Sequence, residues 1–183
     1  MTVSDIARGA ARLTTFAVLS AGIVTTGAVT AHADGGAAND TVIPNNQRLN
    51  NGVAQSIYVI KRQAGCPTDL KVNPALELAA QRHAEDVLNN RALDGDIGSD
   101  GSTVQERAQA AGYRGTVAET VAILPSMVIN GIDILGNWYY RPDYFAIMSN
   151  CANTQIGVRT STNSLDRAVT VAVYGQPAFP PTQ

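Results

Sequence analysis

Valine recurs at every second position near the end of the chain, in DRAVTVAVYGQ at residues 166–176. Alternation of this kind places Val169, Val171 and Val173 on one face of a β-strand. A second strand-like segment, TQIGVRTS at 154–161, precedes it across the turn TNSL. The two segments predict an antiparallel hairpin, so the fold must contain a sheet.

Upstream of the hairpin, the apolar residues follow the period of an α-helix. Residues 47–64 form one predicted helix, which ends at Gly65 and has the apolar face Leu49, Val53, Ile57 and Ile60. A second predicted helix begins at Pro74 with Asn73 as its N-cap. Its buried face would comprise Leu76, Ala79, Ala80, His83 and Val87.

The middle of the chain contains a predicted loop and two more predicted helices. Glycine and aspartate dominate residues 94–102, which indicates a loop that folds back on itself. Ser102 or Thr103 would cap a short helix that ends at Gly112, and a longer helix would run from about Ser126 to Tyr140. Pro142 would end that longer helix. Helices followed by a hairpin indicate an α+β fold, with helices packed on an antiparallel sheet.

The first 33 residues have the features of an export signal. Arg8 and Arg12 precede the apolar run FAVLSAGIVTTGAVT, and the small-residue site AHA ends at Ala33. A membrane span is the competing interpretation, but glycine, serine and threonine dilute the run and no stop-transfer charges follow. We therefore expect a signal peptide at 1–33, a flexible leader at 34–46, one domain at 47–176 and a tail at 177–183, with no span after cleavage.

Charge and cysteine content narrow the functional classes. The formal charge of −2 becomes −3 without the signal, and no basic run is present, which argues against nucleic acid as a partner. Cys66 and Cys151 lie in the exported part, where oxidising conditions favour one disulfide over two thiols. A catalytic cysteine is the alternative. The expected location is secreted or extracellular.

Few residues of the exported part are suited to catalysis or metal binding. His83 is the one histidine left after cleavage, and its place on an apolar helix face favours a hydrogen-bonded structural role over that of a catalytic base. A zinc site needs more His or Cys ligands, so no metal or other cofactor is expected. Asp94, Asp96 and Asp100 could offer oxygen ligands to calcium from one loop, or form a solvated acidic turn.

Glu119 is a lone charge in the apolar segment GTVAETVAIL. Burial of an unpaired carboxylate costs several kcal/mol, roughly, so the side chain must face water or find partners. The segment is therefore either an edge with Glu119 in solvent or the wall of a polar cleft, and the pattern favours neither.

The succession of motifs resembles the CAP superfamily, the cysteine-rich secretory, antigen 5 and pathogenesis-related 1 proteins. The resemblance covers residues 47–176. Within the family, the sequence looks similar to the small secreted actinobacterial members. The motifs are LELAAQRHAEDVL, GSDGST, RAQAAGY, AETVA, NWYYRPDYFAIM, TQIGV and VAVYGQ. The resemblance implies an α-β-α sandwich with a central antiparallel sheet. It also implies a cleft that, in typical members, contains two histidines and two acidic residues.

Carried over to this sequence, the resemblance implies a degenerate cleft. The two histidine positions fall on Asp96 and Tyr144, one acidic position falls on Arg141, and Glu119 retains the other. This favours Glu119 facing the cleft and removes the usual two-histidine metal site. Trp138 and Phe145 are expected to pack in the core, whereas Tyr144 could line the cleft or join the core.

The resemblance implies a binding function more than a catalytic one. We expect a non-catalytic module that binds a small lipid-like ligand or a surface partner, with Asp96, Glu119, Arg141 and Tyr144 as candidate contacts. A hydrolase acting on peptide or cell-envelope material, with Glu119 as base, is the alternative. A purely structural exported domain is a third interpretation.

Overall fold

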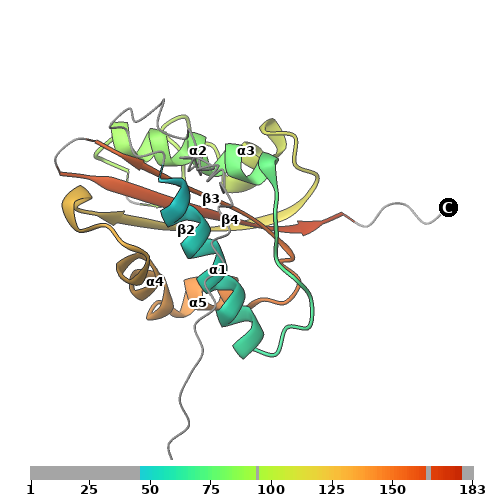
Figure 1. Cartoon of the computed structure of the whole chain (residues 1–183). Helices are drawn as coiled ribbons and strands as arrows, with labels where there is room; N and C mark the ends of the chain where they lie inside the picture. The colour runs from blue at the N-terminus through green and yellow to red at the C-terminus, as the bar shows by residue number, and fades with distance from the viewer. Residues whose placement is uncertain (1–45, 94, 164–165, 179–183) are drawn as a thin grey trace, which may run out of the picture. The chain divides into compact units, whose positions relative to one another are not determined.

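The computed structural model describes residues 46–93, 95–163 and 166–178. The predicted signal peptide, almost all of the predicted leader, Asp94 and the last five residues lie outside this part of the chain. Figure 1 shows its helices and strands in chain order. Within it, no helix is long and apolar enough to cross a membrane.

In the described part of the chain, four strands form one sheet in the order β1-β3-β4-β2. They are β1 (Lys71–Val72), β2 (Gly115–Leu124), β3 (Gln155–Thr162) and β4 (Ala168–Pro177). The predicted hairpin is confirmed, because β3 pairs antiparallel with β4. β2 also pairs antiparallel with β4, and only the two-residue β1 is parallel to its neighbour β3.

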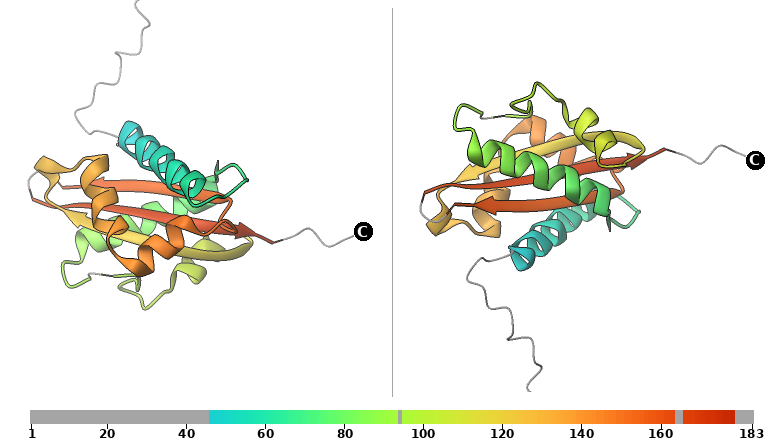
Figure 2. Two further views of the ribbon diagram at one scale, coloured as in Figure 1. Left: turned by 90° about the horizontal axis from the view of Figure 1, so that it is seen from below. Right: turned by 90° about the horizontal axis from the view of Figure 1, so that it is seen from above.

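The described helices cover both faces of this sheet. They are α1 (Gln47–Gln63), α2 (Pro74–Asn89), α3 (Val104–Ala110), the short 3-10 helix η2 (Ser126–Val128), α4 (Gly131–Tyr139) and α5 (Pro142–Ser149). Figure 2 shows α2 and α3 on one face and α1, α4 and α5 on the other. The predicted α+β class and α-β-α arrangement are thus confirmed.

Helix boundaries were predicted well where caps are explicit. The side chain of Asn73 accepts hydrogen bonds from the backbone N–H groups of Ala75 and Leu76, and Pro74 opens α2. Thr103, one of the two expected caps, begins α3 with a complete capping box to Glu106. Both caps act on the turn that follows them, and Asn73 also donates to Oε1 of Gln155 and to the carbonyl of Ile156.

The single helix predicted from Ser126 to Tyr140 is wrong. The backbone turns after η2, and Asn130 caps a new helix by accepting hydrogen bonds from the N–H groups of Ile132 and Asp133. Pro142 also opens α5 instead of only ending a helix, because its fixed φ suits the first helical position. The aromatic stretch therefore spans two helices joined by a sharp bend.

Each face of the sheet has its own buried core. The α1 side contains Val53, Ile57, Ile134, Trp138, Met148 and Ile156. The α2 side contains Leu76, Ala80, Val87, Val121, Val171 and Val173. Trp138 is fully buried and Phe145 packs against the first core, which agrees with their expected packing roles. Gly157 brings α2 onto β3, since a Cβ there would lie 2.1 Å from the backbone nitrogen of Glu77.

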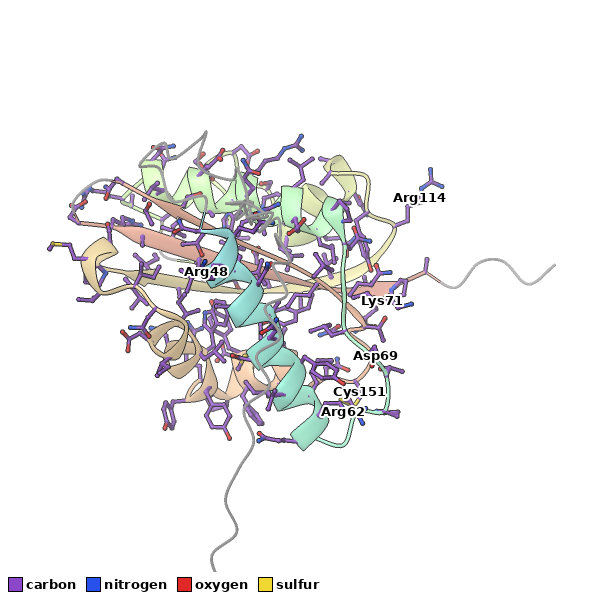
Figure 3. The ribbon with its side chains drawn as sticks, in the orientation of Figure 1. Arg48, Arg62, Asp69, Lys71, Arg114 and Cys151 are labelled. Atoms are coloured by element: carbon purple, nitrogen blue, oxygen red, sulfur yellow. A yellow bond between two sulfur atoms is a disulfide. The ribbon has the colours of Figure 1, made fainter. Side chains whose placement is uncertain are left out.

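The predicted disulfide between Cys66 and Cys151 is present. It joins the loop after α1 to the turn after α5, and Figure 3 places Cys151 beside Arg62 near the end of α1. Arg62 donates hydrogen bonds of 3.0 Å to the carbonyls of Cys66 and Pro67. The buried Lys61 ammonium donates to the carbonyl of Asn150. The bridge and these bonds together tie α1 to the end of α5.

Candidate functional site

Tyr144, Asp96 and Arg141 lie together beside strand β2. The Tyr144 hydroxyl donates to Oδ1 of Asp96 over 3.2 Å, and the Arg141 guanidinium carbon lies 3.7 Å from the centre of the Tyr144 ring. Tyr144 itself is buried, whereas Asp96 and Arg141 are exposed. Tyr144 comes from α5 and Asp96 from the loop after α2, so the two helical layers meet here at the edge of the sheet.

Glu119 faces inward although β2 is an edge strand. Its side chain is 1% exposed and points to the α2 and α3 layer, where it pairs with the Arg107 guanidinium. The interpretation with Glu119 in solvent is therefore wrong. β2 pairs with β4 along its length, and Val121, two residues on, packs in the core of the same layer. The carboxyl group is stabilised by a cation and not by water.

Arg107, which sequence reasoning missed, connects Glu119 to the Asp96 loop. Its guanidinium donates to the carbonyls of Ser102 and Asp96 over 2.6 and 2.7 Å, as well as to Oε1 of Glu119. Burial of a lone glutamate implied a cationic partner. The sequence did not indicate which arginine this was, because twelve residues and a turn separate the two.

His83 lies beneath the same cluster on the inner face of α2. Its Nε2 lies 3.1 Å from the carbonyl oxygen of Gly95 and 3.8 Å from Oε1 of Glu119. A carbonyl can only accept, so Nε2 carries the proton. The buried ring is hydrogen-bonded, as expected for a structural histidine, and it also contacts Glu119.

Burial dominates the electrostatics of this cluster. It raises the pKa of Glu119 from its ordinary value of 4.5 to about 8, and the opposing Arg107 charge compensates in part. It also lowers the pKa of His83 below 6.5, with the Arg107 charge adding to that effect. Around neutral pH both groups therefore favour their neutral forms in the folded protein, and the contact of Glu119 with Arg107 becomes a full ion pair as pH rises above about 8.

Replacing Glu119 with Gln should flatten the dependence of stability on pH between about 6.5 and 8. The folded-state pKa of Glu119 lies above 4.5, so its contribution to stability is full below 4.5 and is lost as pH rises toward about 8. His83 acts oppositely, because its contribution is lost only as pH falls below 6.5. Urea unfolding midpoints across this range measure the slope, and an unchanged slope in the variant would contradict the assignment to Glu119.

The chemistry available to these residues is limited. In the described part of the chain, no three His, Cys, Asp or Glu side chains are grouped to hold a metal ion. Asp100 accepts a hydrogen bond from the backbone of Ser102 while Asp96 accepts one from Tyr144, and Asp94 lies outside the described residues. The Glu119 carboxyl is sequestered beneath Arg107, which does not favour its use as a hydrolytic base.

A second candidate site is an apolar groove between α1 and α4. Two adjoining hollows of about 720 and 300 Å³ share Ser56, Gly131 and Ile132. We call them together the α1/α4 groove. Its other apolar and glycine lining residues are Leu49, Gly52, Ile60, Ile129, Leu135, Gly136, Tyr139 and Tyr140, and the polar Asn46, Gln47, Arg48 and Asn130 also line the larger hollow. Ile132 and Tyr140 are 85% and 84% exposed, so large apolar surfaces border this groove. None of the four predicted cleft residues lines it.

Comparison with known proteins places these features in a family. The model of the cysteine-rich secretory protein family, CAP, matches residues 44–174. An outer surface protein from Borrelia burgdorferi is a structural relative with TM-score 0.64 and 16% identity, over 73% of this chain and 96% of that one. An extracellular SCP-domain protein from Bacillus anthracis has TM-score 0.54 and 16% identity, over 69% and 41% of the two chains. No curated protein sequence matches the chain.

Proposed function

The chain belongs to the cysteine-rich secretory protein (CAP) family, and we propose that it is a secreted, non-catalytic binding module that holds a lipid-like ligand in the α1/α4 groove. An extracellular location and an origin among the small actinobacterial members are part of this proposal. The neighbours described as an outer surface protein and an extracellular protein support that location. The burial of the Glu119 carboxyl beneath Arg107 supports a binding role.

The observation that carries this proposal is the open, apolar character of the groove. Large apolar side chains on folded proteins are normally exposed singly, and contiguous exposed patches mark binding sites. Here Ile132 and Tyr140 are largely exposed within the groove, and Met127 is 86% exposed shortly before α4. Such a lining would accept an acyl chain and leave a polar head group in water.

Glycines keep the groove open. Gly52 lies in α1, Gly131 opens α4, and Gly136 lies within α4. A Cβ built at any of the three meets no atom within 4 Å. Glycine inside a helix lowers helix stability by up to about 1 kcal/mol relative to alanine. Gly52 and Gly136 therefore reduce the stability of their helices and leave space in the groove. Larger residues at these positions would narrow the groove.

Replacing Ile132 with Asp should weaken binding of a fluorescent fatty acid, cis-parinaric acid, by about tenfold or more. The change removes apolar contact and places a charge where the acyl chain would lie, and a loss of about 1.4 kcal/mol is tenfold in affinity. Fluorescence titration of the chain from Asp34, with the disulfide intact, measures the affinity.

The matched control is Ile97 to Asp. Ile97 is also exposed, at 52%, but it lies in the loop after α2 and does not line the groove. The Ile97 to Asp variant should bind cis-parinaric acid with the affinity of the wild type. Equal weakening by both changes, or no binding by the wild type, would rule out the α1/α4 groove as a lipid site.

A further inference from the structure

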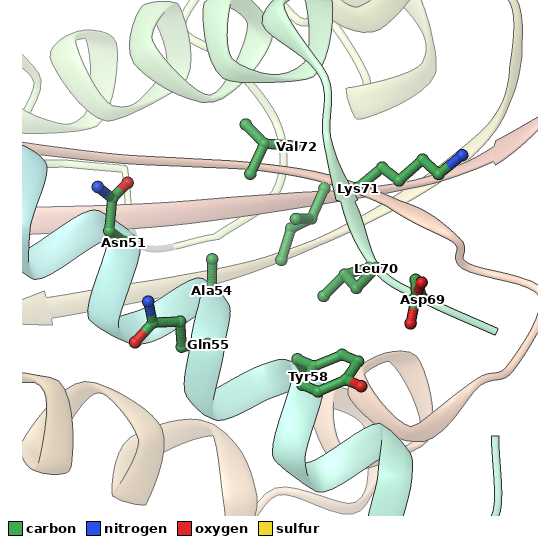
Figure 4. Close-up of a pocket in the computed structure, with 9 residues that line it drawn as sticks. Asn51, Ala54, Gln55, Tyr58, Asp69, Leu70, Lys71 and Val72 are labelled. Atoms are coloured by element: carbon green, nitrogen blue, oxygen red, sulfur yellow. The ribbon is translucent and has the colours of Figure 1, made fainter. Parts of the chain in front are cut away.

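We propose that a second groove, on the opposite flank of α1, binds a short extended peptide segment. This α1/β1 groove lies between α1 and the edge strand β1, has a volume of about 530 Å³ and is shown in Figure 4. Its lining includes Asn51, Ala54, Gln55 and Tyr58 from α1, with Leu70 and Val72 opposite. It shares none of these residues with the α1/α4 groove, so the inference does not depend on the proposed lipid site.

The backbone of β1 forms an open sheet edge along the rim of this groove. The N–H groups of Lys71 and Asn73 donate to β3, at the carbonyls of Thr154 and Ile156. In a parallel ladder the residue between them directs its N–H and C=O away from that partner. Val72 therefore offers one donor and one acceptor outward, and it is 56% exposed. An extended peptide can pair with such an edge.

Side-chain amides on α1 form the opposite wall. Asn51 and Gln55 are one helical turn apart, and Figure 4 shows both side chains on the groove side of α1. Neither side-chain amide makes a hydrogen bond to the described residues 46–93, 95–163 and 166–178, although both residues lie within α1. Each amide carries donors and an acceptor, which complement the donor and acceptor of a peptide group.

The apolar floor and the length of the groove fit about three residues. Leu70 and Val72 point into the groove, and Ala54 and the buried Ile156 complete the floor. Lys71 also lines the groove, with its side chain extending to the other side of the strand in Figure 4. From Asn51 to Tyr58 the helix rises by about 10 Å, at 1.5 Å per residue. An extended segment of about three residues spans the same length.

Charge favours a basic group at one end of this peptide. Asp69 and Tyr58 lie at the end of the groove opposite Asn51 and Gln55 (Figure 4). Asp69 is exposed and has no ion-pair partner in the described part of the chain. A lysine side chain or an amino terminus would therefore be complementary to Asp69, whereas an acidic residue would be repelled.

The probe that tests this proposal is the capped tripeptide acetyl-Lys-Val-Val-amide, titrated into the chain from Asp34 labelled with ¹⁵N. We expect the side-chain amide signals of Asn51 and Gln55 to shift and saturate at millimolar probe. Replacing Asp69 with Lys should weaken binding of this probe by about two- to fivefold, the range for an exposed charge pair. The Asp69 to Lys variant should bind acetyl-Glu-Val-Val-amide more tightly than acetyl-Lys-Val-Val-amide.

A blocking variant and its control complete the experiment. Ala54 to Trp should fill the groove and abolish the shifts, whereas Ala64 to Trp, after the end of α1, should preserve them. Unmoved amide signals in the wild type would overturn the proposal. Shifts of the same signals on dilution of the protein alone would assign the groove to a second copy of the chain, and would also overturn it.

Discussion

Replacing both Cys66 and Cys151 with alanine should lower the free energy of unfolding by about 2–5 kcal/mol, the usual cost of removing a native disulfide. The two residues are 85 positions apart, so the bridge closes a long loop. The chain-entropy model gives about 4–5 kcal/mol for a loop of this size. Urea denaturation followed by circular dichroism measures the difference.

Reduction of the wild-type protein is the matched control for this pair of substitutions. Cys66 is 2% exposed, so its replacement also removes buried sulfur contacts. Reduction breaks the covalent link and retains both side chains, which separates the cross-link from local packing. Oxidised and reduced protein with the same unfolding midpoint would show that the bridge adds no stability, and any loss in the alanine variant would then be due to packing.

The periodic segments of the fold could be predicted from the sequence. The alternating valines of β4 and the four-residue spacing in α1 each predict an element with a buried face, which is a local property of the chain. That the opposite face of β4 is also buried was not predicted, because it depends on the second helical layer. Asn73 with Pro74 predicted the start of α2 because a cap acts on the next turn. The break near Asn130 was missed because the apolar pattern continues across it, and only the capping contacts show that a new helix begins there.

The candidate cleft could be predicted only in part. The resemblance to the family selected Asp96, Arg141 and Tyr144, and the structure brings these three together. It brings Glu119 near them through Arg107, a contact between α3 and β2 that depends on how the short helix docks. Whether these residues bind a ligand remains a prediction. Neither groove beside α1 was predicted, since a groove depends on the distance between packed elements.

Replacing Arg107 with Met should destabilise the protein by about 3–5 kcal/mol at about pH 9, the range for breaking a buried ion pair by removing one partner. At that pH Glu119 would have to hold an unpaired carboxylate in a site that is 1% exposed, or take up a proton that it does not carry in water, and either costs stability. The carbonyls of Ser102 and Asp96 would also lose a donor. Chemical denaturation at several pH values measures the loss.

The loss of stability caused by Arg107 to Met should become smaller as pH falls to about 6. Burial already raises the pKa of Glu119 to about 8, and without the guanidinium it would rise further, so the carboxyl can become neutral by taking up a proton. A double variant that adds Glu119 to Gln should therefore recover stability at about pH 9 and little at about pH 6.

An exposed arginine provides the comparison that makes this result specific. Arg91 pairs with Asp166 at the surface, where both side chains are more than half exposed, and Arg91 to Met should leave stability close to that of the wild type. An equal and pH-independent loss in both arginine variants would mean that Arg107 acts through packing alone. A loss confined to Arg107 that grows with pH would mean that the guanidinium stabilises the charge of Glu119, and that this internal pairing occupies the carboxyl which a hydrolytic mechanism would need.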